Sequence, residues 1–277
     1  MKTLWGAAFQ NPVLLAAGTA GFGREIDGVM DLDRLGGIVT KAVTPEPRRG
    51  HPGPRVAEFR GGMLNAIGLA NPGLEDVAAH DLPWLFNRVT RARVLVNVAG
   101  ATVEDYVKVL ERLGGIDRVT AFEINASCPN TSAGGLEFGA DEASLANLVR
   151  RCRGATTKPL VIKLSPVLAN IARAGEVARD AGADGLSLVN TMPATLEGRL
   201  GNGFGGMSGP ALLPVGVLAI RKVRARVDLP LIGVGGIRTG ADAREYLNAG
   251  ADLIAIGTAA LADPRVPERI ARSLNGG

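Results

Sequence analysis

The sequence has few of the residues that build covalent cross-links and metal centres. Its 277 residues include two cysteines, Cys128 and Cys152, and two histidines, His51 and His80. Two cysteines form no disulfide framework and suit a reducing compartment, so we expect a cytoplasmic protein. The isolated histidines offer no cluster with the spacing of zinc or iron ligands, and no Ser-His-Asp arrangement is evident. We therefore expect neither a metal site nor serine-hydrolase chemistry.

Long apolar runs and clustered charges are missing as well. No stretch approaches the ~20 apolar residues of a membrane span. The first residues lack the apolar core and cleavage pattern of a signal peptide. The net charge of +4 is modest and its basic groups are scattered, with only short clusters such as residues 221–226. Nucleic-acid binding needs a concentrated basic face. The composition thus predicts a protein that binds neither a membrane nor nucleic acid.

The chain does contain a regular alternation of apolar strands and amphipathic helices. Eight apolar segments are typical of strands: residues 13–17, 37–41, 94–98, 119–125, 160–164, 185–189, 231–234 and 252–256. Helix candidates occupy residues 103–113, 142–152, 171–181, 214–227 and 241–249. This alternation predicts a parallel sheet, and eight units in a chain of this length predict a closed (β/α)8 TIM barrel. The rival, an open doubly wound sheet, lacks a G-x-G-x-x-G motif at its first helix. We expect residues 1–277 to form a single domain with a short N-terminal extension, residues 1–12.

Two segments are longer than ordinary barrel connections. Residues 44–93 follow the second strand and are rich in proline and glycine, and residues 191–209 follow the sixth strand. Loops of more than ~12–15 residues are usually functional or disordered. Both segments leave the C-terminal ends of strands, where barrel active sites form. We interpret them as covers over an active site rather than as plain surface insertions.

Glycine turns follow the last two strands. Gly235 and Gly236 come after the seventh strand, and Gly257 and Thr258 come after the eighth. In barrels these two loops often bind a phosphate through backbone N–H groups, and glycine lets the backbone approach the anion. The glycines could serve only as tight turns, but their presence after both strands favours a phosphate site. The pattern does not identify the molecule that carries the phosphate.

Polar residues stand at the ends of five neighbouring strands. They are Lys41, Asn97, Asn125, Lys163 and Asn190. A buried polar group without a partner costs ~1–3 kcal/mol. Five such groups at equivalent positions of an apolar barrel therefore indicate that a polar ligand supplies their partners.

The acid/base group stays open from the residues alone. The candidates are Cys128, Lys163, Lys41 and a carboxylate such as Glu123. Cys128 follows a strand, precedes a proline and lies between Asn125 and Asn130, a poor place for core packing, so we favour it as catalytic. Cys152, on an amphipathic helix, we interpret as a packing residue. A thiol with a pKa near ~8.5 is only a few per cent thiolate at neutral pH, so a reaction that needs the Cys128 thiolate should accelerate toward alkaline pH.

Together these features resemble the class 1 dihydroorotate dehydrogenases. The resemblance centres on Asn125-Ala-Ser-Cys128-Pro-Asn130, followed by Gly134-Gly135. It runs through the whole chain, with Asn11-Pro12, Thr40-Lys41, Pro54-Arg55, residues 63–69, Asn71-Pro72-Gly73, Asn97-Val98-Ala99-Gly100, residues 161–166, Val189-Asn190-Thr191, residues 205–210, Gly235-Gly236 and Gly257-Thr258. Residues 64–69 and Pro83-Trp84-Leu85 look most like the type 1B catalytic subunits.

The resemblance implies an FMN cofactor and the residues that hold it. The phosphate would be held by Gly209, Gly235, Gly236, Gly257 and Thr258. The flavin ring would lie near Ala17, Lys41, Ala42, Asn97, Asn125, Lys163 and Val189, with Lys163 countering charge on the reduced ring. Relatives often carry serine where Ala17 stands and threonine where Ala42 stands, and residues 191–209 look shorter than in type 1B enzymes.

The resemblance also implies oxidation of (S)-dihydroorotate to orotate in pyrimidine (UMP) biosynthesis. Cys128 would remove the C5 proton while C6 delivers hydride to FMN N5, and Lys41 and Lys163 would assist. The substrate-binding residues would be Lys41, Asn65, Ala66, Ile67, Gly68, Leu69, Asn71, Asn125, Asn130, Asn190 and Thr191. Amide and ammonium groups suit a carboxylate and two ring carbonyls.

The electron acceptor lies outside these motifs. Two cysteines cannot ligate an iron–sulfur cluster, which needs about four, and the chain has no dinucleotide fingerprint. The type 1B resemblance implies a homodimer with an FAD and 2Fe-2S electron-transfer subunit, a heterotetramer that passes electrons to NAD. A type 1A homodimer using fumarate is the alternative.

Three other functions remain open from the sequence. The first is another FMN-dependent pyrimidine reductase, such as a dihydrouracil dehydrogenase, although such enzymes often carry histidine where Asn130 stands. The second is a non-redox barrel lyase in which Lys163 forms a Schiff base with a phosphorylated substrate. The third is a non-catalytic phosphate-binding scaffold.

Overall fold

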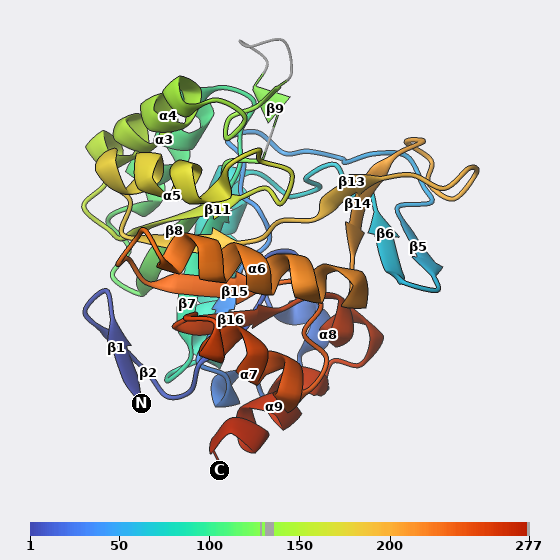
Figure 1. The fold of residues 1–277 in the computed structure, drawn as a ribbon. Helices are drawn as coiled ribbons and strands as arrows, with labels where there is room; N and C mark the ends of the chain where they lie inside the picture. The colour runs from blue at the N-terminus through green and yellow to red at the C-terminus, as the bar shows by residue number, and fades with distance from the viewer. Residues whose placement is uncertain (128, 131–135, 276–277) are drawn as a thin grey trace.

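The computed structural model describes residues 1–127, 129–130 and 136–275, and its centre is a closed barrel of eight parallel strands (Figure 1). The strands are β3 (Val13–Leu15), β4 (Gly37–Val39), β7 (Arg93–Val98), β8 (Val119–Asn125), β11 (Leu160–Leu164), β12 (Gly185–Leu188), β15 (Leu231–Val234) and β16 (Leu253–Ile256). They pair in chain order, and β16 closes onto β3. The (β/α)8 prediction is confirmed, with each strand at its expected place.

Helices surround the barrel on the outside. They are α3 (Val103–Leu113), α4 (Glu142–Ala155), α5 (Ile171–Asp180), α6 (Leu213–Arg224), α7 (Gly240–Asn248), α8 (Thr258–Ala262) and α9 (Val266–Asn275). Capping boxes begin two of them, because Thr102 and Thr239 each accept a hydrogen bond from an aspartate N–H three residues on. Among the described residues, no helix combines the length and apolarity that a bilayer crossing requires.

The N-terminal residues close one end of the barrel. β1 (Lys2–Leu4) and β2 (Ala7–Phe9) form a hairpin, and the Phe9 side chain is fully buried with the apolar residues of the barrel interior. The Trp5 indole N–H donates to Asp184 O at 2.8 Å, just before β12 begins. A Cβ on Gly185 would lie 2.8 Å from the Trp5 ring, so the glycine leaves room for the indole. The predicted N-terminal extension is therefore a plug in the N-terminal mouth, and the opposite mouth is left for a ligand.

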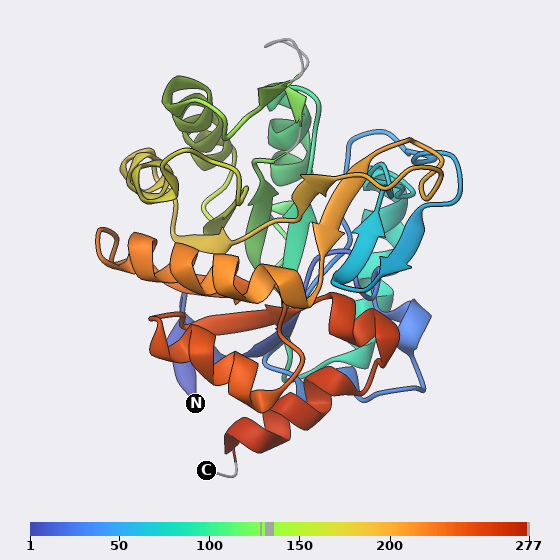
Figure 2. The ribbon, with the colours of Figure 1, turned by 45° about the vertical axis from the view of Figure 1, so that its right-hand side comes forward.

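The two long insertions meet in one antiparallel sheet. Residues 44–92 contribute β5 (Val56–Phe59) and β6 (Gly62–Asn65), followed by α1 (Leu74–Asp76), the π-helical η3 (Val77–Asp81) and α2 (Leu82–Arg88). The later insertion contributes β13 (Met192–Ala194) and β14 (Gly205–Ser208). The strand order is β13-β14-β6-β5, so β14 joins β6 across the two insertions (Figure 2). Because both insertions leave the C-terminal ends of strands, the sheet rises on that side of the barrel.

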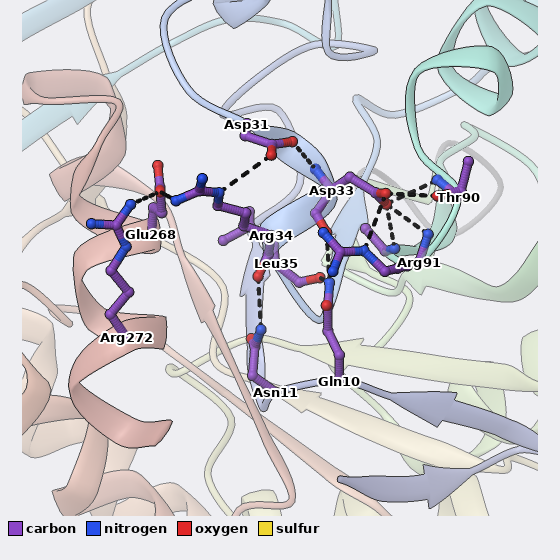
Figure 3. Close-up of polar contacts among 11 residues, drawn as sticks. Gln10, Asn11, Asp31, Asp33, Arg34, Leu35, Thr90, Arg91, Glu268 and Arg272 are labelled. Atoms are coloured by element: carbon purple, nitrogen blue, oxygen red, sulfur yellow. Dashed lines mark hydrogen bonds and ion pairs between the residues drawn. The ribbon is translucent and has the colours of Figure 1, made fainter. Parts of the chain in front are cut away.

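A network of polar contacts holds the loops at the N-terminal side of the barrel (Figure 3). Asp33, in the short η2 (Leu32–Arg34), accepts hydrogen bonds from the N–H groups of residues 90–92, just before β7. The Thr90 hydroxyl donates to it as well, at 2.8 Å. Arg34 reaches Glu268 on α9 at 2.7 Å. Burial by itself would raise the pKa of Asp33, but the hydrogen bonds from Ala92, Arg91 and Thr90 outweigh it and lower the pKa to about 2.

Candidate functional site

Polar side chains line the interior of the barrel near its C-terminal end. In β8 the side chains of Phe122 and Ile124 face the surrounding helices. Because successive side chains of a strand point to opposite faces, Glu123 and Asn125 face the barrel interior. The same alternation places Asn97 in β7 and Lys163 in β11 on the inner side. Below this layer the interior is apolar, with buried side chains of Val39, Leu95, Ala121, Val161, Ile232 and Leu253. A polar layer over an apolar core is the arrangement that the strand-end residues predicted.

Glu123 links two of the predicted site residues. Its Oε1 accepts a hydrogen bond from Asn97 Nδ2 at 2.7 Å and lies 3.7 Å from Lys163 Nζ. The glutamate is 1% exposed, Asn97 2% and Lys163 7%. Buried charges persist in proteins only when they are paired. The carboxylate therefore serves as the counter-ion of the buried ammonium and also fixes the rotamer of the amide.

Asn125 and Asn190 form a second pair. Asn190 Nδ2 donates to Asn125 Oδ1 at 3.1 Å, and Asn190 Oδ1 accepts from the Thr191 N–H at 2.8 Å. The Tyr106 hydroxyl donates to the Asn125 backbone carbonyl at 2.8 Å and holds the end of β8. The structure thus brings together three residues that the sequence predicted for the substrate. In the described part of the chain no acceptor faces the Asn125 Nδ2 group, which is left for a ligand.

Lys41 lies beyond the strand to which the sequence assigned it. β4 ends at Val39, because the Lys41 N–H leaves the ladder and donates to Gly21 O at 2.8 Å. β3 likewise ends at Leu15, before Ala17, and β12 ends at Leu188, before Asn190. The Lys41 side chain is half-buried, and none of the described residues pairs with its ammonium. A half-buried cation without a protein partner is suited to an anionic ligand.

The segment predicted to cover the substrate is held mainly by its own hydrogen bonds. Asn71 donates to Thr44 Oγ1 and to Leu69 O, each at 2.8 Å, and accepts from the Gly73 N–H. Its carboxamide is therefore engaged in shaping the loop. Asn65 Nδ2 donates to Gly206 O at 3.2 Å and joins the two insertions. Ala66, Ile67, Gly68 and Leu69 lie between these two amides, next to β6.

The glycine turns after β15 and β16 have the donors that a phosphate needs. Gly235 and Gly236 have φ values of 121° and 74°, which favour glycine. Within the described residues, the N–H groups of Gly236 and Gly257 donate to no acceptor. Thr258 is the first residue of α8. Its hydroxyl donates to Ser208 Oγ at 2.8 Å, next to Gly209. This donor set of backbone N–H groups and a hydroxyl fits the phosphate of a bound cofactor.

The predicted base lies outside the described residues. Cys128 is among the undescribed positions, and Asn130 is described only as part of β9 (Pro129–Asn130), which pairs with β10 (Leu136–Glu137). The catalytic role of Cys128 stays a prediction. Cys152 is fully buried, and burial, offset in part by nearby arginines, raises the pKa of its thiol to about 12. Its interpretation as a packing residue agrees with that position.

Glu123 is the residue whose place in the site the sequence left undefined. It counted there only as one acid/base candidate among several. The signal that could have placed it is the strand alternation of residues 121–125, which sets Glu123 on the same face as Asn125. Its bond to Asn97 joins residues 26 positions apart, which lie opposite each other in the pairing of β7 with β8.

Comparison with known proteins identifies the chain. The family model described as dihydroorotate dehydrogenase matches residues 1–276. The catalytic subunit of dihydroorotate dehydrogenase B (NAD(+)) from Listeria monocytogenes serotype 4a (strain HCC23) is 46% identical over 275 residues, covering 97% of this chain and 90% of the relative. The corresponding subunit from Desulforudis audaxviator (strain MP104C) is 46% identical over 277 residues, covering 97% and 89%.

A solved structure shares the fold. The dihydroorotate dehydrogenase of Eimeria tenella, determined in complex with ferulenol, superposes with a TM-score of 0.83 at 24% identity and covers 98% of this chain and 82% of that one. At this identity the likeness concerns the fold alone. With the family model matching nearly the full length, the chain belongs to the dihydroorotate dehydrogenase family, on the branch of the B-type catalytic subunits.

Proposed function

We propose that this protein oxidises (S)-dihydroorotate to orotate in pyrimidine biosynthesis, as a single FMN-binding domain spanning residues 1–277. The observation that carries the proposal is the polar layer in the C-terminal mouth of the barrel. There Lys163, Asn97, Asn125 and Asn190 converge above an otherwise apolar interior. The family membership and the 46% identity to B-type catalytic subunits support the same reaction.

FMN is the cofactor that fits the donor set. Its phosphate would be held by the N–H groups of Gly236 and Gly257 and by Thr258, with Gly209 and Gly235 beside them. Lys163 and Asn97 would face the ring from the barrel interior, and Ala17, Ala42 and Val189 would lie around it. Bound FMN supplies a two-electron acceptor that takes hydride from the substrate.

The substrate carries a carboxylate and ring carbonyls, and the chain has matching donors. Lys41 has an ammonium without a protein partner and would bind an anionic group. The Asn125–Asn190 pair and the Thr191 segment would orient the ring through their amides. The sheet of the two insertions, with Asn65 at its junction, would exclude water from this mouth.

Cys128 would be the base. Its thiolate would take the proton from C5, and hydride would leave C6, so that the C5–C6 single bond becomes the double bond of orotate. Two electrons and two hydrogens leave the substrate, one as a proton on the thiol and one as hydride. The thiolate is a minor species near neutral pH, so the rate should rise toward alkaline pH.

The experiment that tests the proposal begins with colour. Purified protein should be yellow from bound flavin, and anaerobic dihydroorotate should bleach it. Cys128→Ala should keep the flavin but bleach about 10²–10⁴-fold more slowly, the usual contribution of a general base. The matched control is Cys152→Ala, which removes the buried thiol and should bleach at the normal rate.

Two outcomes would contradict this assignment. Colourless protein that takes up no FMN would refute the redox function. Normal bleaching by Cys128→Ala would remove this cysteine from the mechanism.

We further propose that a second subunit carries the electrons away. The chain's two cysteines cannot ligate an iron–sulfur cluster. A homodimer of this chain would join an FAD and 2Fe-2S subunit in a heterotetramer that passes electrons to NAD. Co-purification with such a subunit, and NAD reduction only in its presence, would support this assembly; rapid turnover with fumarate by the chain alone would contradict it.

A further inference from the structure

The stability of the fold does not require the buried ion pair of Glu123 and Lys163. Pairing two charges inside a protein often stabilises it less than apolar side chains of the same volume would. Below the polar layer the barrel interior is filled by such apolar side chains. A carboxylate that is 1% exposed in this place therefore points to a task in the site above it.

Glu123 contacts Asn97 and Lys163, the two residues that face the proposed cofactor site. A single oxygen, Oε1, accepts from Asn97 Nδ2 at 2.7 Å and lies 3.7 Å from Lys163 Nζ. The ammonium is thus within ion-pair range but beyond hydrogen-bond range, and no other described side chain is paired with it. Its three N–H donors are therefore not used by the described residues and can bind a ligand.

The charges of the two groups act on the flavin with opposite signs. A nearby ammonium favours electron uptake by the ring, because the reduced ring gains negative charge. A carboxylate 3.7 Å behind that ammonium offsets part of its field. The offset is large in a buried site, where the effective dielectric is far below that of water.

We propose that Glu123 is a positioning residue that sets the reduction potential of the bound flavin through Lys163. The inference rests on the proposed function, because it assumes a flavin over the polar layer. Glu123 holds the ammonium and the Asn97 amide in place, and its charge keeps the potential low enough for electrons to leave again. Without that charge, reduction by substrate is more favourable and reoxidation is slower.

The test is the two-electron reduction potential of the flavin, measured by equilibration with a redox dye in the full chain with its flavin bound. Glu123→Gln removes the charge and keeps an oxygen that can accept from Asn97. The equilibrium constant for flavin reduction should rise at least tenfold, which equals a rise of about 30 mV for two electrons. An unchanged or lower potential would overturn the proposal.

Two further variants separate charge from packing. Glu123→Asp keeps the charge, so its potential should stay closer to the unmodified protein than that of Glu123→Gln; equal shifts in the two variants would overturn the proposal. Ser187→Ala is the matched control, because Ser187 is fully buried, faces the interior and lies opposite Lys163 in the neighbouring strand. It removes no charge and should change the equilibrium constant less than threefold.

The same experiment distinguishes this inference from the proposed function. Unmodified protein without flavin, or with flavin that dihydroorotate does not bleach, would contradict the function. If dihydroorotate bleaches the unmodified protein but the reduction potential of the flavin is unchanged in Glu123→Gln, only the role of Glu123 is contradicted. Thermal unfolding of each variant checks that it is folded; if Glu123→Gln is not folded, Glu123→Met, which also removes the charge and has a similar volume, carries the test.

Discussion

At the scale of single residues, Asp33 shows what one side chain contributes to the fold. Its carboxylate accepts five hydrogen bonds from residues 90–92 and so ties the segment before β4 to the segment before β7. The side chain is 16% exposed, so solvent screens these bonds little. The carboxylate lies at the N-terminal side of the barrel, away from the proposed site. Its role is therefore stability rather than chemistry.

Replacing Asp33 should destabilise the protein in a pH-dependent way. The pKa of Asp33 in the folded protein is about 2, below the 3.8 of an ordinary aspartate. A lowered folded pKa gives stability that is present above the unfolded pKa and lost as pH falls toward 2. Asp33→Asn should therefore cost about 2 kcal/mol of unfolding free energy at pH 7, and the difference should shrink between pH 4 and 2. Urea unfolding at a series of pH values measures this.

The control for this prediction is Asp180→Asn. Asp180 is 59% exposed and its partner is the adjacent Arg179. Exposed pairs of this kind contribute about 0–1 kcal/mol. A loss for Asp33→Asn no larger than for the control, or one that is independent of pH, would contradict the hydrogen-bonded role of Asp33.

Residue type and position along a strand were enough to place some of the site residues but not others. Lys163, Asn97 and Asn125 could be predicted from strand ends, because an apolar strand that ends in an amide or ammonium is a local signal. Asn71 could not be assigned in the same way. Its carboxamide binds Thr44 and Leu69 of its own loop, and a sequence does not show which acceptor an amide will meet.

At the scale of elements, the joining of the two insertions is the main feature of the C-terminal side. β14 pairs with β6 through Gly206 and Asn65. A Cβ at Gly206 would lie 2.1 Å from Thr191 Oγ1, so only glycine allows the strand to pass this close to Thr191. The sheet therefore fixes the position of a residue that we assign to the substrate.

A side chain at Gly206 should weaken substrate binding and spare the flavin. Gly206→Ala would displace Thr191, so the dihydroorotate concentration for half-maximal bleaching should rise about tenfold, the effect of losing ~1.4 kcal/mol. The flavin content should be unchanged. The flavin absorbance before substrate is added measures the flavin content, and titration of the bleaching with dihydroorotate measures the half-maximal concentration.

Glu197→Ala serves as the control in the same insertion. Glu197 is exposed, and within the described residues its side chain has no hydrogen-bond or ion-pair partner. Its substrate titration should match that of the unmodified protein. If Gly206→Ala behaves like this control, the strand is not what positions Thr191.

At the scale of the whole molecule, the two ends of the barrel have different tasks. The N-terminal mouth is filled by the hairpin of β1 and β2, with Phe9 fully buried and Trp5 edge-on to it at 6.0 Å between ring centroids. The C-terminal mouth carries the polar layer. This division separates changes in stability from changes in chemistry.

Truncating the plug should cost stability without altering the bound flavin. Phe9→Ala removes a fully buried ring and should lower the unfolding free energy by about 3–5 kcal/mol. The absorption spectrum of the flavin in the folded protein and its bleaching by substrate should be normal. Leu218→Ala, at a side chain 52% exposed, should change stability by about 0.5 kcal/mol or less. A shifted flavin spectrum in Phe9→Ala would show that the two ends are coupled.

The sequence by itself determined the barrel, the order of its strands and the positions of five of its helices, α3 to α7. These follow from local signals: apolar runs, helical periodicity and glycine turns. It also determined which strands end in polar side chains, and through the motif around Cys128 it indicated the family.

Only the tertiary structure decided which polar groups meet. The Glu123–Asn97 bond, the pairing of β14 with β6 and the Trp5 contact with Asp184 join residues 26 to 179 positions apart. Such contacts depend on which strands pair and in which register, and no local pattern encodes these. The counter-ion beneath the proposed flavin site is therefore a property of the pairing of β7, β8 and β11.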